Sequence, residues 1–170
     1  MSDKKKKIKP NTIGRALALQ ALYQQELNPQ DSLENDWREL YDCCCEETQA
    51  SLTDEELGVA IKYARRLFEG TTTRLREIDD LLNKALDKRT LKQTTVVDRN
   101  ILRVAAYEMR FVKTPKAIVI SEAIELGKKF GESSSQAFIN GVLDQIDGVP
   151  LDNSTFAVVE ASSPEDKGMV

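Results

Sequence analysis

Apolar residues recur every three or four positions through most of the chain, which is the spacing of one face of an α-helix. This pattern predicts helices over residues 11–27, 32–48, 53–70, 73–86, 95–112, 115–130 and 133–147. Strand-type alternation is rare, and only 8 glycines and 5 prolines interrupt the 170 residues. We therefore predict an all-α protein.

Capping and helix-breaking residues place several of the expected helix ends. Asn11 or Thr12 is suited to cap the first helix, because both side chains can accept a hydrogen bond from a free backbone N–H. Thr53 and Glu56 have the spacing of a capping box at the start of the third helix. Gly70 is expected to end that helix, since glycine tolerates the backbone conformation found after a helix.

The periodic region indicates one compact helical domain between two less regular ends. Residues 1–10 read as a flexible basic arm, which contains Lys4–Lys7 and Lys9, and residues 148–170 read as a flexible acidic tail. The helical domain spans residues 11–147. We expect two small subdomains in it, with three helices in residues 11–70 and four in residues 73–147.

The composition argues against catalysis and against a bound cofactor or metal. The chain has no histidine, which removes the commonest general base and metal ligand. It lacks a glycine-rich phosphate-binding motif, and adjacent cysteines such as Cys43–Cys45 are poorly placed to close a tetrahedral metal site. No apolar run approaches the roughly 20 residues that cross a bilayer. We therefore expect a cytoplasmic protein with reduced thiols, no enzymatic activity and no membrane association.

Glu108 is the one acidic residue that falls on a predicted buried face, between Val104 and Val112. A buried carboxylate needs hydrogen-bond donors or a cation, or it takes up a proton. It could be a catalytic acid, or a structural carboxylate that accepts backbone N–H groups at the start of the helix near Pro115. We favour the structural interpretation because no second catalytic group is found nearby in the sequence.

The basic residues are unevenly distributed, although the net charge is only −4. On the helix predicted for residues 95–112, Arg99, Arg103 and Arg110 fall on one narrow stripe. Such a stripe can bind a phosphate backbone, or it can be a solvated face paired with acids elsewhere. Together with Lys9 and Arg15, it raises the expectation of a nucleic-acid partner.

Several segments, in order, resemble the NusB family. They are RALALQALY at 15–23, ILRVAAYE at 101–108, AIEL at 123–126, KFG at 129–131 and FINGVLD at 138–144. Any one of these segments can arise by chance, but jointly they are specific. They span most of residues 11–147.

The resemblance implies two perpendicular helical subdomains and a non-catalytic role in transcription antitermination. It also implies binding to boxA-type RNA of ribosomal RNA transcripts, a heterodimer with the small-subunit ribosomal protein NusE, and a place in an RNA polymerase antitermination complex. The residues expected to contact RNA are Lys9, Arg15, Tyr23, Arg99, Arg103, Ser134 and Phe138. Asp98 is expected to be an exposed carboxylate that contacts NusE.

Two other functions remain open at this point. A NusB-like domain also precedes the catalytic domain of an RNA cytosine methyltransferase, so the chain could be an adaptor related to that domain. The second alternative is a helical adaptor that binds only proteins. Binding of the purified chain to a boxA-containing RNA distinguishes the latter from an RNA-binding factor.

Overall fold

The computed structural model describes residues 8–29, 37–44 and 52–151. Within these ranges the secondary structure is helical and contains no strand, which confirms the all-α prediction. The expectations for Lys4–Lys7, for Cys45 and for the tail beyond residue 151 lie outside the described residues. Cys43 is exposed and carries a free thiol.

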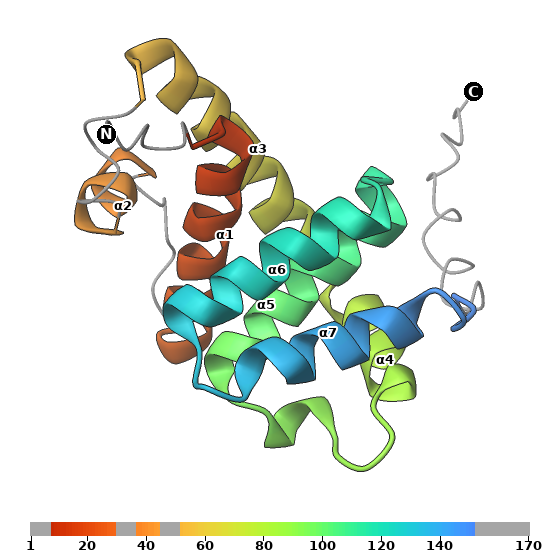
Figure 1. The fold of residues 1–170 in the computed structure, drawn as a ribbon. Coiled ribbons are helices and arrows are strands. Elements are labelled where there is room, and N and C mark those ends of the chain that lie inside the picture. The colour runs from red at the N-terminus through yellow and green to blue at the C-terminus, as the bar shows by residue number, and fades with distance from the viewer. Residues whose placement is uncertain (1–7, 30–36, 45–51, 152–170) are drawn as a thin grey trace, which may run out of the picture.

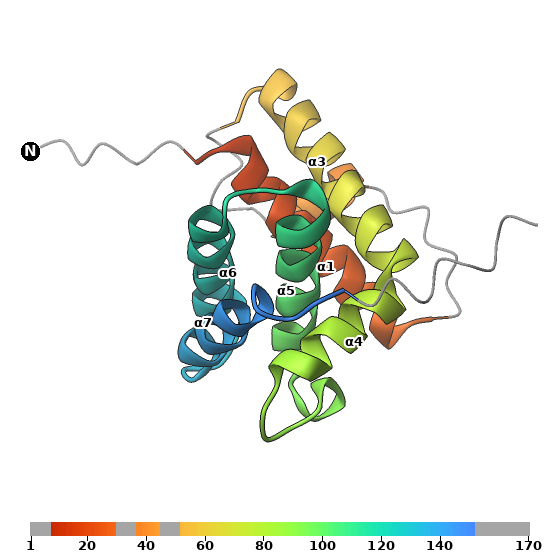
Figure 2. The ribbon, with the colours of Figure 1, turned by 90° about the vertical axis from the view of Figure 1, so that its right-hand side faces the viewer.

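Seven α-helices form the described part of the protein, with one short 3₁₀ turn and one π-helical turn (Figure 1). They are α1 (Pro10–Leu27), α2 (Trp37–Cys44), α3 (Asp54–Thr73), α4 (Leu75–Ala85), the 3₁₀ turn η1 (Leu91–Gln93), α5 (Val96–Tyr107), the π-helical turn η2 (Glu108–Val112), α6 (Lys116–Phe130) and α7 (Ser135–Ile146). Helix α5 is central: Figure 2 shows α3 on one side of it, α6 and α7 on the other, and α1 crossing behind it.

The helix starts follow local side-chain chemistry, with one correction. At α3 the capping box is present: the Glu56 N–H donates to Thr53 Oγ1 at 3.2 Å, and the Thr53 N–H donates to Glu56 Oε2 at 2.9 Å. The predicted caps Asn11 and Thr12 are wrong, because α1 already begins at Pro10 and its N-cap is Lys9. Proline suits this first position, where its missing N–H would have had no helical partner.

Gly70 does not end α3, which continues to Thr73. A Cβ atom at Gly70 would lie 2.0 Å from Cζ of Tyr107, so the ring of Tyr107 occupies the space of a side chain at this position. The glycine is therefore explained by the close approach of α5 to α3. Sequence reasoning assigned it to a helix end because the long-range contact is invisible in a local pattern.

Helix α1 contributes to every part of the hydrophobic core. One set of its side chains, including Leu17 and Ala21, packs with α2 and α3. Another set, including Leu19, packs with α4, α5, α6 and α7, and Leu22 joins a third cluster with α3 and α5. Burying a leucine completely, as for Leu17, stabilises the fold by roughly 1.5–3 kcal/mol. The two predicted subdomains therefore share α1 as a common core element.

The helix predicted for residues 95–112 changes from an α-helix to a π-helix in its last third. It is α-helical to Tyr107 and then π-helical from Glu108 to Val112. Lys113 follows with a φ of 63°, in the left-handed region, and the Thr114 N–H donates to the carbonyl of Glu108 at 3.2 Å. Isolated π-turns inside helices frequently accompany functional or structurally special residues. Here the turn begins at the buried carboxylate that the sequence singles out.

No helix within the described ranges is long and apolar enough to cross a membrane.

Candidate nucleic-acid interface

The residues predicted to contact RNA lie on three helices or directly before them. Lys9 caps α1, which contains Arg15 and Tyr23; Arg99 and Arg103 lie on α5, and Ser134 and Phe138 lie at the start of α7. Lys9 is exposed and Tyr23 is 39% exposed, so both side chains are accessible to a partner.

Arg15 is buried, with 5% of its surface exposed, and its guanidinium is engaged inside the protein. Nε donates to Glu108 Oε2 at 2.9 Å and Nη2 donates to Glu108 Oε1 at 2.5 Å, while Nη1 lies 3.3 Å from Glu122. Burial lowers the pKa of Arg15, but the hydrogen bond and the charge of Glu108 outweigh burial and raise it. The pair ties α1 to η2, and RNA contact by Arg15 stays a prediction.

Glu108 is 1% exposed, in agreement with its predicted burial, but its predicted partners are wrong. Its carboxylate accepts hydrogen bonds from Arg15 and from the hydroxyl of Tyr63, at 2.6 Å, instead of from backbone N–H groups near Pro115. The donors come from α1 and α3, which are 93 and 45 residues away in sequence. Local sequence patterns contain no information about such distant partners.

Tyr63 should make the stability of the cluster of Arg15, Tyr63 and Glu108 depend on pH. Burial, and then the hydrogen bond to Glu108, raise the pKa of Tyr63 to about 12 from its ordinary value of 10.0. The neutral phenol therefore contributes stability that is complete below pH 10 and is lost as the pH rises towards 12. In an ultraviolet absorbance titration, we expect one tyrosine to ionise about two pH units late. The Tyr63→Phe variant should lack this late step, and an identical titration of both proteins would contradict the assignment.

Arg99 and Arg103 are also paired with acids, and each side chain is only 12% exposed. Arg99 Nε donates to Glu26 at 2.9 Å, and Arg103 donates to both oxygens of Asp79 at 2.8 Å and to Glu26 at 2.9 Å. Burial raises the pKa of Glu26, but hydrogen bonds from Arg99 and Asn100 outweigh burial and lower it.

The third member of the stripe, Arg110, donates to the backbone carbonyls of Ile146 and Val149. Of the two interpretations of the arginine stripe, the geometry therefore favours pairing within the protein. Arg99 and Arg103 fix α5 against α1 and α4, and Arg110 fixes η2 against the end of α7 and the residues after it. RNA contact by Arg99 or Arg103 stays a prediction. It requires these arginines to bind RNA in addition to, or in place of, Glu26 and Asp79.

Asp98 is 7% exposed, so the expectation of an exposed carboxylate is wrong. It lies in the first turn of α5, where its backbone N–H donates to Thr95 Oγ1 at 3.2 Å. Its Oδ1 atom is buried and has no hydrogen-bond partner among the described residues. The positive end of the helix dipole favours a carboxylate here. Contact with NusE stays a prediction, and a lysine at this position would disturb the fold as well as an interface.

The start of α7 offers a surface whose chemistry suits RNA, and we call it the α7 basic surface. It comprises Arg89, Lys128, Lys129, Ser134 and Phe138. Ser134 is exposed at the N-cap of α7, and Lys128 and Lys129 are exposed at the end of α6. The half-buried ring of Phe138 has the Arg89 guanidinium 5.5 Å from its centre. Beside it, the loop that contains Arg89 lines a hollow of about 540 Å³.

Each component of the α7 basic surface matches one requirement of RNA binding. The cations can neutralise phosphates, and an aromatic ring or a guanidinium plane can stack on an unpaired base. The N-terminus of α7 adds the positive end of its helix dipole, which favours an anion. Ser134 and Phe138 are among the residues predicted from the sequence to contact RNA, whereas Arg89, Lys128 and Lys129 are not, and RNA contact by any of the five stays a prediction. The available signal was the Lys88-Arg89 pair in a loop between two helices.

Comparisons with known proteins agree with this fold. The model of the NusB family matches residues 12–147. The transcription antitermination protein NusB of Myxococcus xanthus is 37% identical over 137 residues, which cover 78% of this chain and 91% of that protein. The NusB protein of Actinobacillus succinogenes is 35% identical over 148 residues, covering 86% and 95%.

Two solved structures are similar over most of their length. Thermotoga maritima NusB superimposes with a TM-score of 0.69 and 34% identity, covering 86% of this chain and 97% of that chain. The second is a crystal structure of the antitermination factors NusB and NusE in complex with double-stranded RNA. It gives a TM-score of 0.62 and 27% identity, covering 81% and 95%. The family match, the identities and the shared helical architecture agree, and the chain belongs to the NusB family.

Proposed function

We propose that this protein is a non-catalytic transcription antitermination factor that binds boxA-type RNA of ribosomal RNA transcripts together with NusE. The observation that carries the proposal is the α7 basic surface: the Arg89 guanidinium lies over the Phe138 ring at the start of α7, and Lys128 and Lys129 are exposed at the end of the preceding helix. It is supported by a similar solved structure in which a NusB protein is bound to NusE and RNA. The site of action of such a factor is the nascent transcript in the cytoplasm, beside RNA polymerase.

In this proposal the parts of the surface have different roles. Lys128, Lys129 and Arg89 hold phosphates, which positions the RNA without reading its sequence. Phe138 stacks on an unpaired base, and the Ser134 hydroxyl, at the positive end of the α7 dipole, binds a phosphate or a base edge. Lys9 and Tyr23 extend the contact along α1. Asp98, at the start of α5, is the proposed contact for basic residues of NusE.

RNA binding with and without NusE tests the proposal. We expect the double substitution Arg89→Gln/Lys129→Gln to weaken binding of a short boxA-type RNA about tenfold, or about 1.4 kcal/mol. The plot of log affinity against log salt should become shallower by about 1.4, since each neutralised charge on a single strand contributes about 0.7. Arg76→Gln is the control, because Arg76 is an exposed arginine on α4 outside this surface.

The same measurements separate this function from the alternatives. Unchanged affinity in the double variant would remove the α7 basic surface from the RNA interface. Absence of RNA binding by the unaltered protein, both alone and with NusE, would leave a protein-only adaptor. The adaptor related to the methyltransferase is less well supported, because the relatives described above are antitermination proteins that match over almost their whole length.

A further inference from the structure

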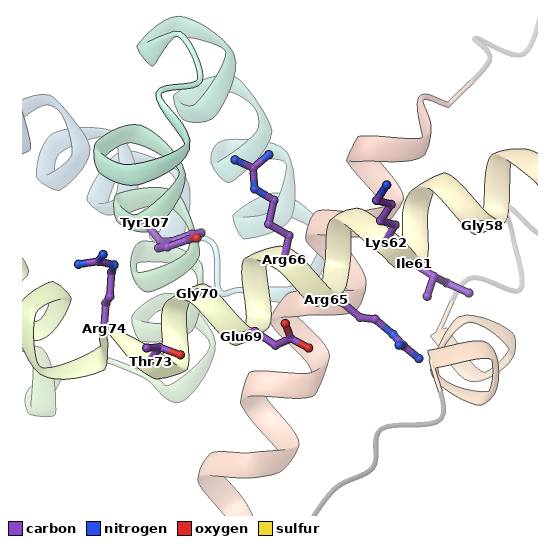
Figure 3. Close-up of a pocket in the computed structure, with 10 residues that line it drawn as sticks. All are labelled: Gly58, Ile61, Lys62, Arg65, Arg66, Glu69, Gly70, Thr73, Arg74 and Tyr107. Carbon is purple, nitrogen blue, oxygen red and sulfur yellow. The ribbon is translucent and has the colours of Figure 1, made fainter. Parts of the chain in front are cut away.

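A second basic hollow lies along the outer face of α3 (Figure 3). Figure 2 shows α3 on the opposite side of α5 from α6 and α7. We call the hollow the α3 groove, and it has a volume of about 720 Å³. Its chemically important lining residues are Lys62, Arg65, Arg66, Gly70, Arg74 and Tyr107. Four cations thus line the groove, against one carboxylate, that of Glu69.

The cations of the α3 groove are arranged by the helical period. Lys62 and Arg66 are four residues apart in α3, so they lie on the same face of that helix, and Arg74 is the residue that directly follows it. Figure 3 shows Lys62 and Arg66 on the side of α3 where the Tyr107 ring lies, whereas Arg65 and Glu69 point to the other side. Position 70 completes the row, and because it is glycine, the Tyr107 ring occupies this gap. The result is a row of cations with an aromatic ring in it.

Lys62 and Arg66 are available to a ligand. Both are exposed, and neither forms an ion pair or a hydrogen bond through its side chain with another described residue. Arg74 is held in place, since it pairs with Glu77 at 3.1 Å and lies over the Phe111 ring at 4.4 Å from its centre. Phe111 in turn stacks on Tyr107, with ring centres 5.6 Å apart and an angle of 26° between the rings. The rings of Tyr107 and Phe111 are therefore held in place within the protein, while Lys62 and Arg66 remain available to bind an anionic ligand.

We propose that the α3 groove binds a second stretch of single-stranded RNA, which extends beyond the segment held at the α7 basic surface. This inference rests on the proposed function and adds a second contact to it. Grooves for single-stranded nucleic acid combine cations that follow the backbone with aromatic rings on which bases stack. An acidic peptide would use the cations but would have no comparable use for the half-buried Tyr107 ring. The pairing of cations with an aromatic ring therefore favours RNA.

The test compares two RNAs and a matched pair of arginine variants. One RNA carries only the short boxA-type sequence. The other extends it on both sides by about 16 unpaired nucleotides, which is the largest number of nucleotides that a single OB-fold domain usually covers on a single strand. We expect Arg66→Gln to weaken binding of the long RNA about fivefold, while Arg76→Gln has no such effect. In Lys62→Gln/Arg66→Gln, the salt slope for the long RNA should fall by about 1.4. The short RNA should bind all variants equally, and a thermal melt checks that these exposed substitutions leave the fold intact.

The outcomes separate the second site from the proposed function. Equal binding of the long RNA by Arg66→Gln and the unaltered protein would overturn the proposal, as would equal losses for both RNAs. If a glutamate-rich peptide binds the protein and Lys62→Gln/Arg66→Gln abolishes that binding while leaving long-RNA affinity intact, the groove is a protein site. If the short RNA fails to bind at all, the proposed function fails. Long-RNA binding that still requires Lys62 and Arg66 then supports the groove independently.

Discussion

Replacing Glu108 with leucine is expected to lower the free energy of unfolding by about 3–5 kcal/mol, because it leaves a buried guanidinium without its main partner. Arg15 is 5% exposed and Glu108 is 1% exposed, so water cannot take over the lost hydrogen bonds. Glu122, at 3.3 Å, retains one contact with Arg15 and places the effect towards the lower end of this range. Urea denaturation measures it. Glu125→Gln is the control, since this exposed carboxylate on α6 should change stability by less than about 0.5 kcal/mol.

A second substitution distinguishes a buried ion pair from a generally sensitive position. In Arg15→Met/Glu108→Leu both charges are absent, and apolar pairs of similar volume are often as stable as buried ion pairs. We expect at least half of the lost stability to return, with the remainder reflecting the unpaired hydroxyl of Tyr63. A double variant as unstable as the single one would contradict this account. If it folds, its affinity for RNA also decides whether Arg15 contacts the ligand.

Gly14→Ala is expected to destabilise the protein by about 1–3 kcal/mol, although alanine is normally the better helix former. A Cβ atom at Gly14 would lie 2.8 Å from the backbone carbonyl oxygen of Ala60 and 3.1 Å from Cδ1 of Tyr63. A backbone atom cannot rotate away, so α1 and α3 would have to separate. The contact between α1 and α3 buries side chains such as Leu17 and Leu57. Separating the two helices loosens this packing, which lowers the free energy of unfolding.

Gly58→Ala is the matched control on the partner helix. A Cβ atom at Gly58 would meet nothing within 4 Å, and the residue is exposed within α3. This substitution should stabilise the protein by about 0.5–1 kcal/mol, because alanine loses less conformational entropy in a helix. Thermal or urea unfolding of both variants should therefore move in opposite directions. A stabilised Gly14→Ala protein would show that the two helices are less tightly packed than the structure indicates.

The helices could be predicted from the sequence because their signals are local. The capping box of Thr53 and Glu56 is complete within four residues, and the structure confirms it. Gly70 was misassigned because the reason for a glycine there is the ring of Tyr107, which comes from another helix. Helix ends and close approaches use the same residue type, and only tertiary structure tells them apart.

The candidate sites could be predicted less well, because charge pairing depends on distant elements. The angular alignment of Arg99 and Arg103 followed from the helical period, but their acids, Glu26 and Asp79, come from α1 and α4. The burial of Glu108 was likewise predictable, whereas its donors were not. Nothing in the local sequence around Lys62 and Arg66 indicates that the ring of Tyr107, from another helix, lines the same groove.

The sharing of α1 between all three core clusters has a consequence for how the chain matures during synthesis. Residues 10–27 emerge from the ribosome early, but Leu19 belongs to a core cluster completed by α4, α5, α6 and α7, and Arg15 pairs with Glu108, which is made later. An incomplete chain that ends after α3 would hold a helix with an exposed apolar face and an arginine without its partner. Such fragments should be efficiently degraded by proteases, whereas the chain that includes α5 to α7 closes around α1 and becomes resistant.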